Sequence, residues 1–226
     1  MYRFANVEAV LVDSLGLGEE SKSRFSARIK QLKRSGFPQG VNVGKLNNFE
    51  YGARELMQLH LIFEFIKYGI SPDPAIFMLN QWWPSIAFIG KQATKHSRVF
   101  LSLRPLDWSG LRSAEEEAVC PPGCEMIKLD ENAKGQDIEK SSCFSGRANS
   151  AIILNMSRIM LRIHNSIDNL VRNDLSGGQF FNEVLSWNDS DLANQQKSII
   201  EGIKFDEDIN SKNPYLKFID CISPLY

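Results

Sequence analysis

The chain has 226 residues, 43% of them hydrophobic and 23% charged, which is the composition of an ordinary globular protein with one large or two small domains. That composition excludes wholesale disorder, and no apolar run is long enough to predict a membrane span. The formal net charge is −1, yet residues 21–49 hold seven Lys/Arg and no Asp or Glu, leaving 19 basic against 27 acidic residues, a net of −8, elsewhere. The basic segment is therefore predicted to bind a polyanion, whereas the acidic remainder of the chain is predicted not to bind one.

The first 38 residues show two helical patterns with a glycine turn between them. Residues 4–15 form the first pattern, and Gly16 breaks it; the second begins near residue 19. Gly36 is the expected C-cap of the second helix, and Pro38 prevents its continuation. The expected buried residues are Val7, Val10, Leu11 and Leu15 in the first helix and Phe25, Ile29 and Leu32 in the second. Two such helices fit a helix-turn-helix.

The face of the second helix opposite its apolar stripe is basic and polar. Cations there would displace the counterions of DNA, and arginine or polar side chains would reach base edges. The alternative is a solvated helix face, but such faces usually mix charges of both signs, which favours DNA contact. We expect Arg24 and Arg28 to read bases, and Lys33 and Arg34 to bind phosphate. The predicted DNA-binding residues of this helix are Lys22, Ser23, Arg24, Arg28, Lys30, Gln31, Lys33 and Arg34.

A β-hairpin is predicted after the basic helix, because apolar residues alternate between glycine and asparagine turns up to Tyr51. This hairpin would form a wing, with Lys45, Asn47 and Asn48 as further DNA-binding residues. A long helix is expected over residues 53–67. It is apolar on two faces, which favours burial of one face against its own domain and of the other against a partner; the expectation of a dimer rests on this helix.

The next helix is predicted to begin where Ser71 caps it and Pro72 fills its first turn, and to end near residues 82–83, before Pro84. Residues 86–93 are then expected to form a separate short helix.

This order of elements over residues 4–82 resembles the MerR-type winged helix-turn-helix DNA-binding domain. The matching residues are Gly36-Phe37 after the basic helix, Tyr51 at the end of the wing, Glu55-Leu56 at the start of the next helix and Gly69-Ile70-Ser71 at its end. The resemblance implies that Arg28 and Lys30 contact DNA and that Lys45, Asn47 and Asn48 lie in the wing. It does not extend to the sensing chemistry of that family.

The rest of the chain predicts an α+β domain, so the fold class is α+β and mainly helical. Residues 99–103 favour a strand, residues 109–146 an acidic mobile loop, and residues 150–171 a helix that a strand could precede. The predicted domains are a winged-helix DNA-binding domain at 1–95 and, at 96–226, a domain for dimerisation, effector binding or partner binding.

No pattern predicts enzymatic chemistry. Motifs of hydrolases, phosphate-binding loops and dinucleotide sites are absent, and the histidines lie far apart in the sequence. Cys120 and Cys124 form a C-x3-C pair without a second pair of zinc-ligand spacing, so free thiols are favoured over a metal site. We therefore expect a protein that is not an enzyme and has no cofactor or metal.

The function predicted from the sequence is a sequence-specific DNA-binding transcriptional regulator that acts as a homodimer on an inverted repeat. Double-stranded DNA is its predicted partner, and the C-terminal domain is a candidate for contact with the transcription machinery or another protein. An architectural or replication/partition factor is the alternative, and an adaptor whose winged helix binds protein is a second one. The N-terminus lacks signal-peptide features, so the predicted location is cytoplasmic, at the nucleoid.

Overall fold

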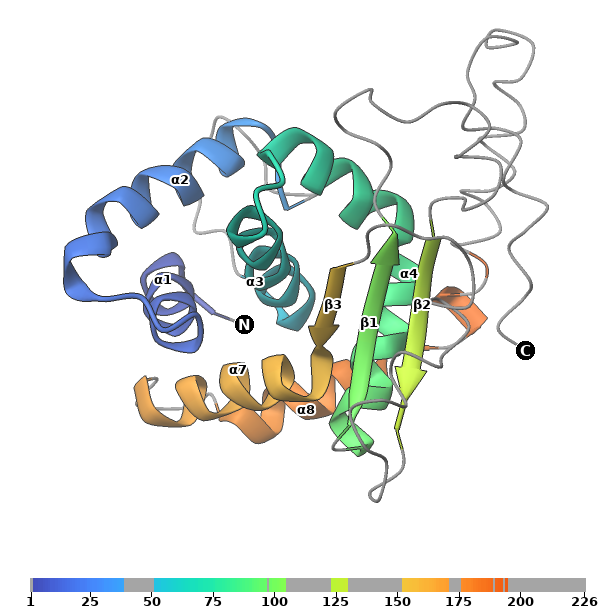
Figure 1. Cartoon of the computed structure of the whole chain (residues 1–226). Helices are drawn as coiled ribbons and strands as arrows, with labels where there is room; N and C mark the ends of the chain where they lie inside the picture. The colour runs from blue at the N-terminus through green and yellow to red at the C-terminus, as the bar shows by residue number, and fades with distance from the viewer. Residues whose placement is uncertain are drawn as a thin grey trace, which may run out of the picture. The chain divides into compact units, whose positions relative to one another are not determined.

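The computed structural model of the chain describes residues 2–38, 51–96, 98–104, 123–129, 152–170, 176–188, 190–192 and 194. Its described residues are mainly helical, with one small antiparallel sheet (Figure 1), which confirms a mainly helical α+β protein. The predicted wing with Lys45, Asn47 and Asn48 lies outside the described residues, as does Cys120. The winged helix-turn-helix as a whole therefore stays a prediction.

The chain forms two compact units. Met1–Asn80 and Arg158–Trp187 make up the first unit, and Gln81–Ser157 and Asn188–Tyr226 the second. Both units draw on early and late parts of the sequence. The predicted division at residue 95 stays a prediction.

The first unit is helical. Its elements are α1 (Phe4–Ser14), the 3-10 turn η1 (Glu19–Ser21), α2 (Lys22–Arg34), α3 (Ala53–Lys67), the first residues of α4 (Pro72–Lys95), most of α7 (Met156–Leu170) and α8 (Gly177–Ser186). These bounds confirm the predicted helices at 4–15 and 53–67, and the basic helix that follows the glycine turn.

Three helices of this unit end in the same way, with a glycine in the left-handed region. Gly16, Gly36 and Gly69 have φ values of 68°, 76° and 84° after α1, α2 and α3. At the end of α2 the amide of Phe37 donates to the carbonyl of Leu32, and the amide of Gly36 donates to the carbonyl of Lys33. These two hydrogen bonds form a Schellman motif. The predicted stop at Gly36 is confirmed.

The core of the first unit is centred on α3. Its apolar side chains are buried on both predicted faces, apart from the half-buried Ile66. Helix α2 reaches this core through Phe25, whose ring lies 4.4 Å from that of Phe63. Because one chain already covers both faces of α3, its apolar character no longer argues for a dimer, and the homodimer stays a prediction.

Helix α4 corrects one expectation. It continues through Pro84 to Lys95, so the predicted end near residues 82–83 and the separate short helix after it are wrong. Trp82, Trp83 and Ile86 are buried on either side of the proline. Burying each such side chain contributes about 1.5–3 kcal/mol, which together outweighs the roughly 3 kcal/mol cost of an interior proline.

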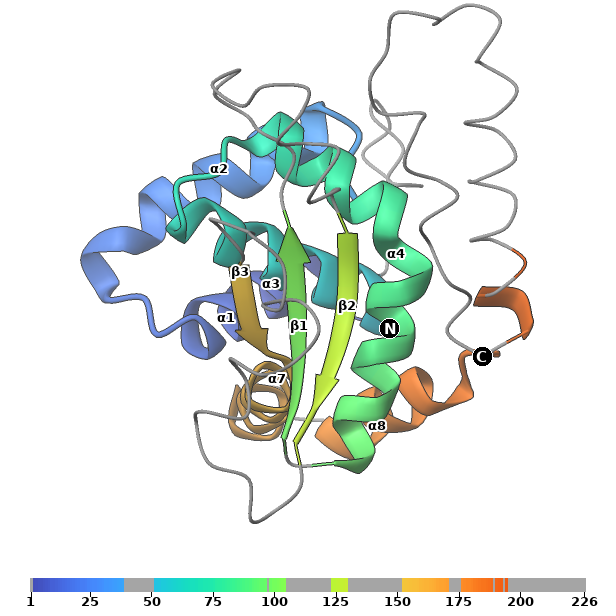
Figure 2. The same ribbon diagram turned by 45° about the vertical axis from the view of Figure 1, so that its right-hand side comes forward.

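The second unit contains a three-stranded antiparallel sheet of order β2-β1-β3. The strands are β1 (Val99–Arg104), β2 (Gly123–Lys128) and β3 (Ile152–Asn155). Leu101 at the centre of β1 is opposite Met126 on one side and Leu154 on the other. The later half of α4, which belongs to the same unit, runs beside the sheet (Figure 2).

Strand β1 and the passage from β3 directly into α7 confirm two predictions. Strand β2 corrects a third, because it lies inside the segment 109–146 that was predicted to be a loop. The main-chain hydrogen bonds of β2 come from pairing with β1 along its whole length. The sequence of the short β2 segment alone does not reveal such long-range pairing.

Within the described residues, no helix combines the length and the apolar character that crossing a membrane requires.

Candidate nucleic-acid interface

Helix α2 is held in the first unit by three apolar side chains and presents most of its other side chains to solvent. Phe25, Ile29 and Leu32 are buried at the predicted spacing. No Asp or Glu lies between Ser21 and Pro38. The described face is therefore uniformly basic, as the sequence predicts.

The structure places nearly all predicted residues of α2 at the surface. Arg24, Arg28, Lys30 and Arg34 make no ion pair or hydrogen bond through their side chains in the part of the chain that the structure describes. The exposed residues are Lys22, Ser23, Arg24, Arg28, Lys30, Gln31 and Arg34, and Lys33 is half-buried. Lys22 has a contact of its own, so the other four exposed cations of α2 are available to an external anion.

Helical spacing divides these side chains into two strips. Arg24, Arg28 and Gln31 are separated by four and three residues, so they lie above one another on one strip of α2. Lys30 and Arg34 are four residues apart on another strip. Arginine pairs with guanine and glutamine with adenine through two hydrogen bonds each, so the first strip has the side chains of a base-reading surface.

Lys33 is directed differently from these cations. Its Nζ lies 4.9 Å from the ring centroid of Phe4 and 5.8 Å from that of Tyr51. Both distances are within the range of cation–π attraction, about 6 Å. Lys33 therefore joins the last turn of α2 to the start of α1 and to the residue that precedes Gly52 and α3.

Tyr51, the residue predicted to close the wing, is fixed by main-chain pairing with Tyr2. The amide of Tyr2 donates to the carbonyl of Tyr51 at 2.7 Å, and the amide of Tyr51 donates back at 2.9 Å. Burial, aided by nearby Glu55, raises the pKa of Tyr51 to about 12. Its phenol is therefore neutral, and the end of the predicted wing is anchored at a defined place.

The start of α3 is capped by two carboxylates, one local and one distant. Glu55 accepts a hydrogen bond from the amide of Gly52 at 2.8 Å. Glu183 of α8, 130 residues away, accepts one from the amide of Ala53 at 2.7 Å. Negative charge at a helix N-terminus is stabilising, so α8 helps to hold the residues that follow the predicted wing.

A second link ties the late helices to α1. The hydroxyl of Ser166 on α7 donates to the carboxylate of Asp13 at 2.6 Å, across 153 residues of sequence. Asp168 accepts a hydrogen bond from the amide of Gly177 at 2.7 Å and so joins α7 to α8. The two late helices therefore support both α1 and α3, and α3 in turn contacts α2 through Phe63 and Phe25.

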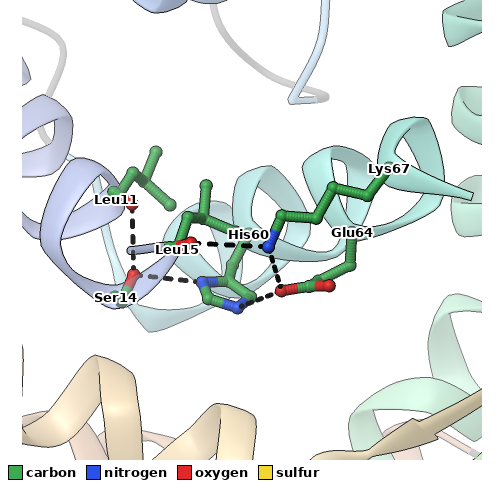
Figure 3. Close-up of polar contacts among 6 residues, drawn as sticks. All are labelled: Leu11, Ser14, Leu15, His60, Glu64 and Lys67. Atoms are coloured by element: carbon green, nitrogen blue, oxygen red, sulfur yellow. Dashed lines mark hydrogen bonds and ion pairs between the residues drawn. The ribbon is translucent and has the colours of Figure 1, made fainter. Parts of the chain in front are cut away.

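A buried polar network connects α1 and α3 (Figure 3). The hydroxyl of Ser14 lies 3.1 Å from Nδ1 of His60, and Nε2 of His60 lies 3.6 Å from Glu64. Lys67 donates to Glu64 at 3.1 Å and to the carbonyl of Leu15 at 3.4 Å. A serine, a histidine and a carboxylate in this order also occur in nucleophilic catalysis.

We interpret this network as structural, because Ser14 is 3% exposed and His60 is fully buried. Burial lowers the pKa of His60, so its ring is neutral. A proton on Nε2 would face Glu64 and leave Nδ1 to accept from Ser14. The 3.6 Å separation of Nε2 from Glu64 is longer than a hydrogen bond, so this contact is electrostatic. Burial raises the pKa of Glu64, but the contacts with His60 and Lys67 outweigh it and lower that pKa to about 2.

Sequence patterns could not find the residues that position this interface. Glu183 and Ser166 act through contacts more than 100 residues away, which no local pattern encodes. Phe4 was expected only as part of an apolar helix. Among the described residues, no three His, Cys, Asp or Glu side chains gather where they could hold a metal ion.

No protein family, curated protein or solved structure matches the chain.

Proposed function

We propose that this protein is a sequence-specific DNA-binding transcriptional regulator that binds double-stranded DNA through the solvent face of α2. The observation that carries the proposal is a set of four exposed cations that have no partner among the described residues, on a segment without any carboxylate: Arg24, Arg28, Lys30 and Arg34. Phosphate contacts release condensed counterions, which is the main source of affinity for DNA.

The strip of Arg24, Arg28 and Gln31 favours sequence reading over purely electrostatic binding. A surface that met only phosphates would need only positive charge, whereas this strip carries two arginines and a glutamine at helical spacing. The resemblance of residues 4–82 to the MerR-type domain supports the same function. In the proposed mechanism a two-fold dimer places α2 of each copy in a major groove of an inverted repeat, with half-sites about one helical turn or a multiple of it apart.

The proposal gives a magnitude for the salt dependence. If about four cations of the basic segment 21–49 in each protomer neutralise phosphates, a protomer contributes about −3.6 to the slope of log affinity against log salt concentration, and a dimer about −7. Losing Arg28, if it reads a guanine, costs about 1–3 kcal/mol of discrimination between sequences.

The test is selection of duplexes from a random-sequence pool by the purified full-length protein at two salt concentrations. The double variant Arg28→Ala/Lys30→Ala should lose the selected sequences, while Lys95→Ala, which removes an exposed cation from α4, should keep them. Enrichment of a few related sequences, lost only in the double variant, would support a regulator.

Two other results would redirect the proposal. Binding without any enriched sequence would favour the architectural or replication/partition factor, which responds to DNA shape. No binding at either salt concentration would refute DNA binding and leave the protein-binding adaptor.

A further inference from the structure

Lys33 differs from the neighbouring cations of α2 in the surroundings of its ammonium group. It is half-buried and lies over two aromatic rings, whereas Lys30 and Arg34 are exposed. A lysine held over rings is oriented by the protein itself, because the attraction depends on where the ammonium sits above each ring face.

The two rings belong to segments that define the position of α2. Phe4 is the first residue of α1, and Tyr51 is paired through its main chain with Tyr2. The two ring centroids lie 6.4 Å apart, so one ammonium contacts both. Because the phenol of Tyr51 is neutral, the attraction is to the ring face and not to a phenolate.

We propose that Lys33 is a positioning residue of the nucleic-acid interface and not a phosphate ligand. By holding the last turn of α2 against Phe4 and Tyr51, it fixes the rotation of the helix and therefore the direction of the strip that contains Arg28. This role rests on the proposed DNA binding. It differs from the sequence-based expectation, in which Lys33 binds phosphate.

The test compares Lys33→Gln with Lys30→Gln, a matched removal of one lysine charge three residues earlier on the exposed face. Each full-length variant is titrated with a duplex selected by the wild-type protein and with a random duplex, across a range of salt concentrations. Lys30→Gln should weaken binding to both duplexes and reduce the salt slope by about 1 per protomer.

Lys33→Gln should leave the salt slope and the affinity for the random duplex unchanged and weaken binding to the selected duplex several-fold. Lys33→Arg, which keeps a cation over the rings, should restore that binding. A salt slope reduced as in Lys30→Gln would overturn the proposal in favour of a phosphate contact. Unchanged affinity for both duplexes would overturn it in favour of a contact that matters for folding alone.

A double-mutant cycle with Phe4→Leu measures the coupling between Lys33 and the Phe4 ring in the absence of DNA. Lys33→Gln should shift the unfolding equilibrium constant about two- to five-fold in the wild type and less in the Phe4→Leu background. A wild-type protein that binds no duplex would refute the proposed function and this role with it. DNA binding by the wild type together with no coupling in the cycle would refute only the role of Lys33.

Discussion

Replacing Gly52 with alanine should destabilise the protein only while Glu183 is present. Gly52 precedes α3 in an extended conformation, with φ −94° and ψ −173°, which alanine also adopts. A Cβ at this position would lie 2.6 Å from Oε1 of Glu183 and 3.1 Å from Oε2 of Glu55. The first contact is too short to persist, so the Glu183 side chain has to move away from the amide of Ala53.

The expected magnitude follows from the contact that is lost. A carboxylate that accepts from a helix N-terminal amide contributes about 1–2 kcal/mol, so Gly52→Ala should cost about that much in the wild type. In a Glu183→Ala background the same change should be close to neutral. There the lower entropy of the unfolded chain, about 0.4–1 kcal/mol, opposes the poorer capping by alanine.

Urea unfolding of the four proteins of this cycle gives the coupling free energy, with unchanged m-values as the condition for comparing them. Asn182→Ala, an exposed neighbour on α8, serves as the control for helix α8. Costs of Gly52→Ala and Glu183→Ala that add to within about 0.5 kcal/mol would refute the reasoning, because independent sites behave in that way.

Burial of His60 and close packing at Gly177 should each produce a measurable change in stability. Burial lowers the pKa of His60 below its value in the unfolded chain, so the unfolded chain binds a proton first as the pH falls. The free energy of unfolding should therefore decrease below about pH 6.5, by up to about 1.4 kcal/mol per pH unit. Urea titrations between pH 7.5 and 5.5 measure this slope, and His60→Gln should flatten it. A Cβ on Gly177 would meet the carbonyl oxygen of His164 at 2.6 Å, whereas one on Gly178 finds its nearest atom at 3.5 Å. Gly177→Ala should thus cost about 1–3 kcal/mol in thermal unfolding, whereas Gly178→Ala should be neutral or stabilise by up to about 1 kcal/mol. Equal effects would contradict the packing of α7 on α8.

Local patterns predicted those elements whose determinants are local. The apolar spacing in α1, α2 and α3 and the glycines after them set both the helices and their ends. Pro84 misled the prediction because its local cost is outweighed by burial of the side chains around it. Strand β2 was missed because its short segment becomes a strand through pairing with β1.

The basic face of the candidate site was also predictable, since charge and helical spacing are properties of the sequence alone. The contacts that hold this face in place were not predictable from the sequence. Glu183 and Ser166 look like ordinary polar residues of late amphipathic helices, and only the fold brings them to Ala53 and Asp13. Long-range contacts of this kind depend on how helices pack, which one sequence does not encode locally.

The use of charge within the first unit favours an external partner for α2. Asp13, Glu55 and Glu183 each accept a hydrogen bond from the protein itself, so these carboxylates are engaged internally. The exposed cations of α2 include Arg28 and Lys30, which have no such partner among the described residues. Stability of the fold alone would not require cations to gather on a helix that itself contains no carboxylate, because exposed ion pairs on helices are themselves mildly stabilising. The arrangement instead suits a surface whose counter-charges are supplied by a polyanion such as DNA.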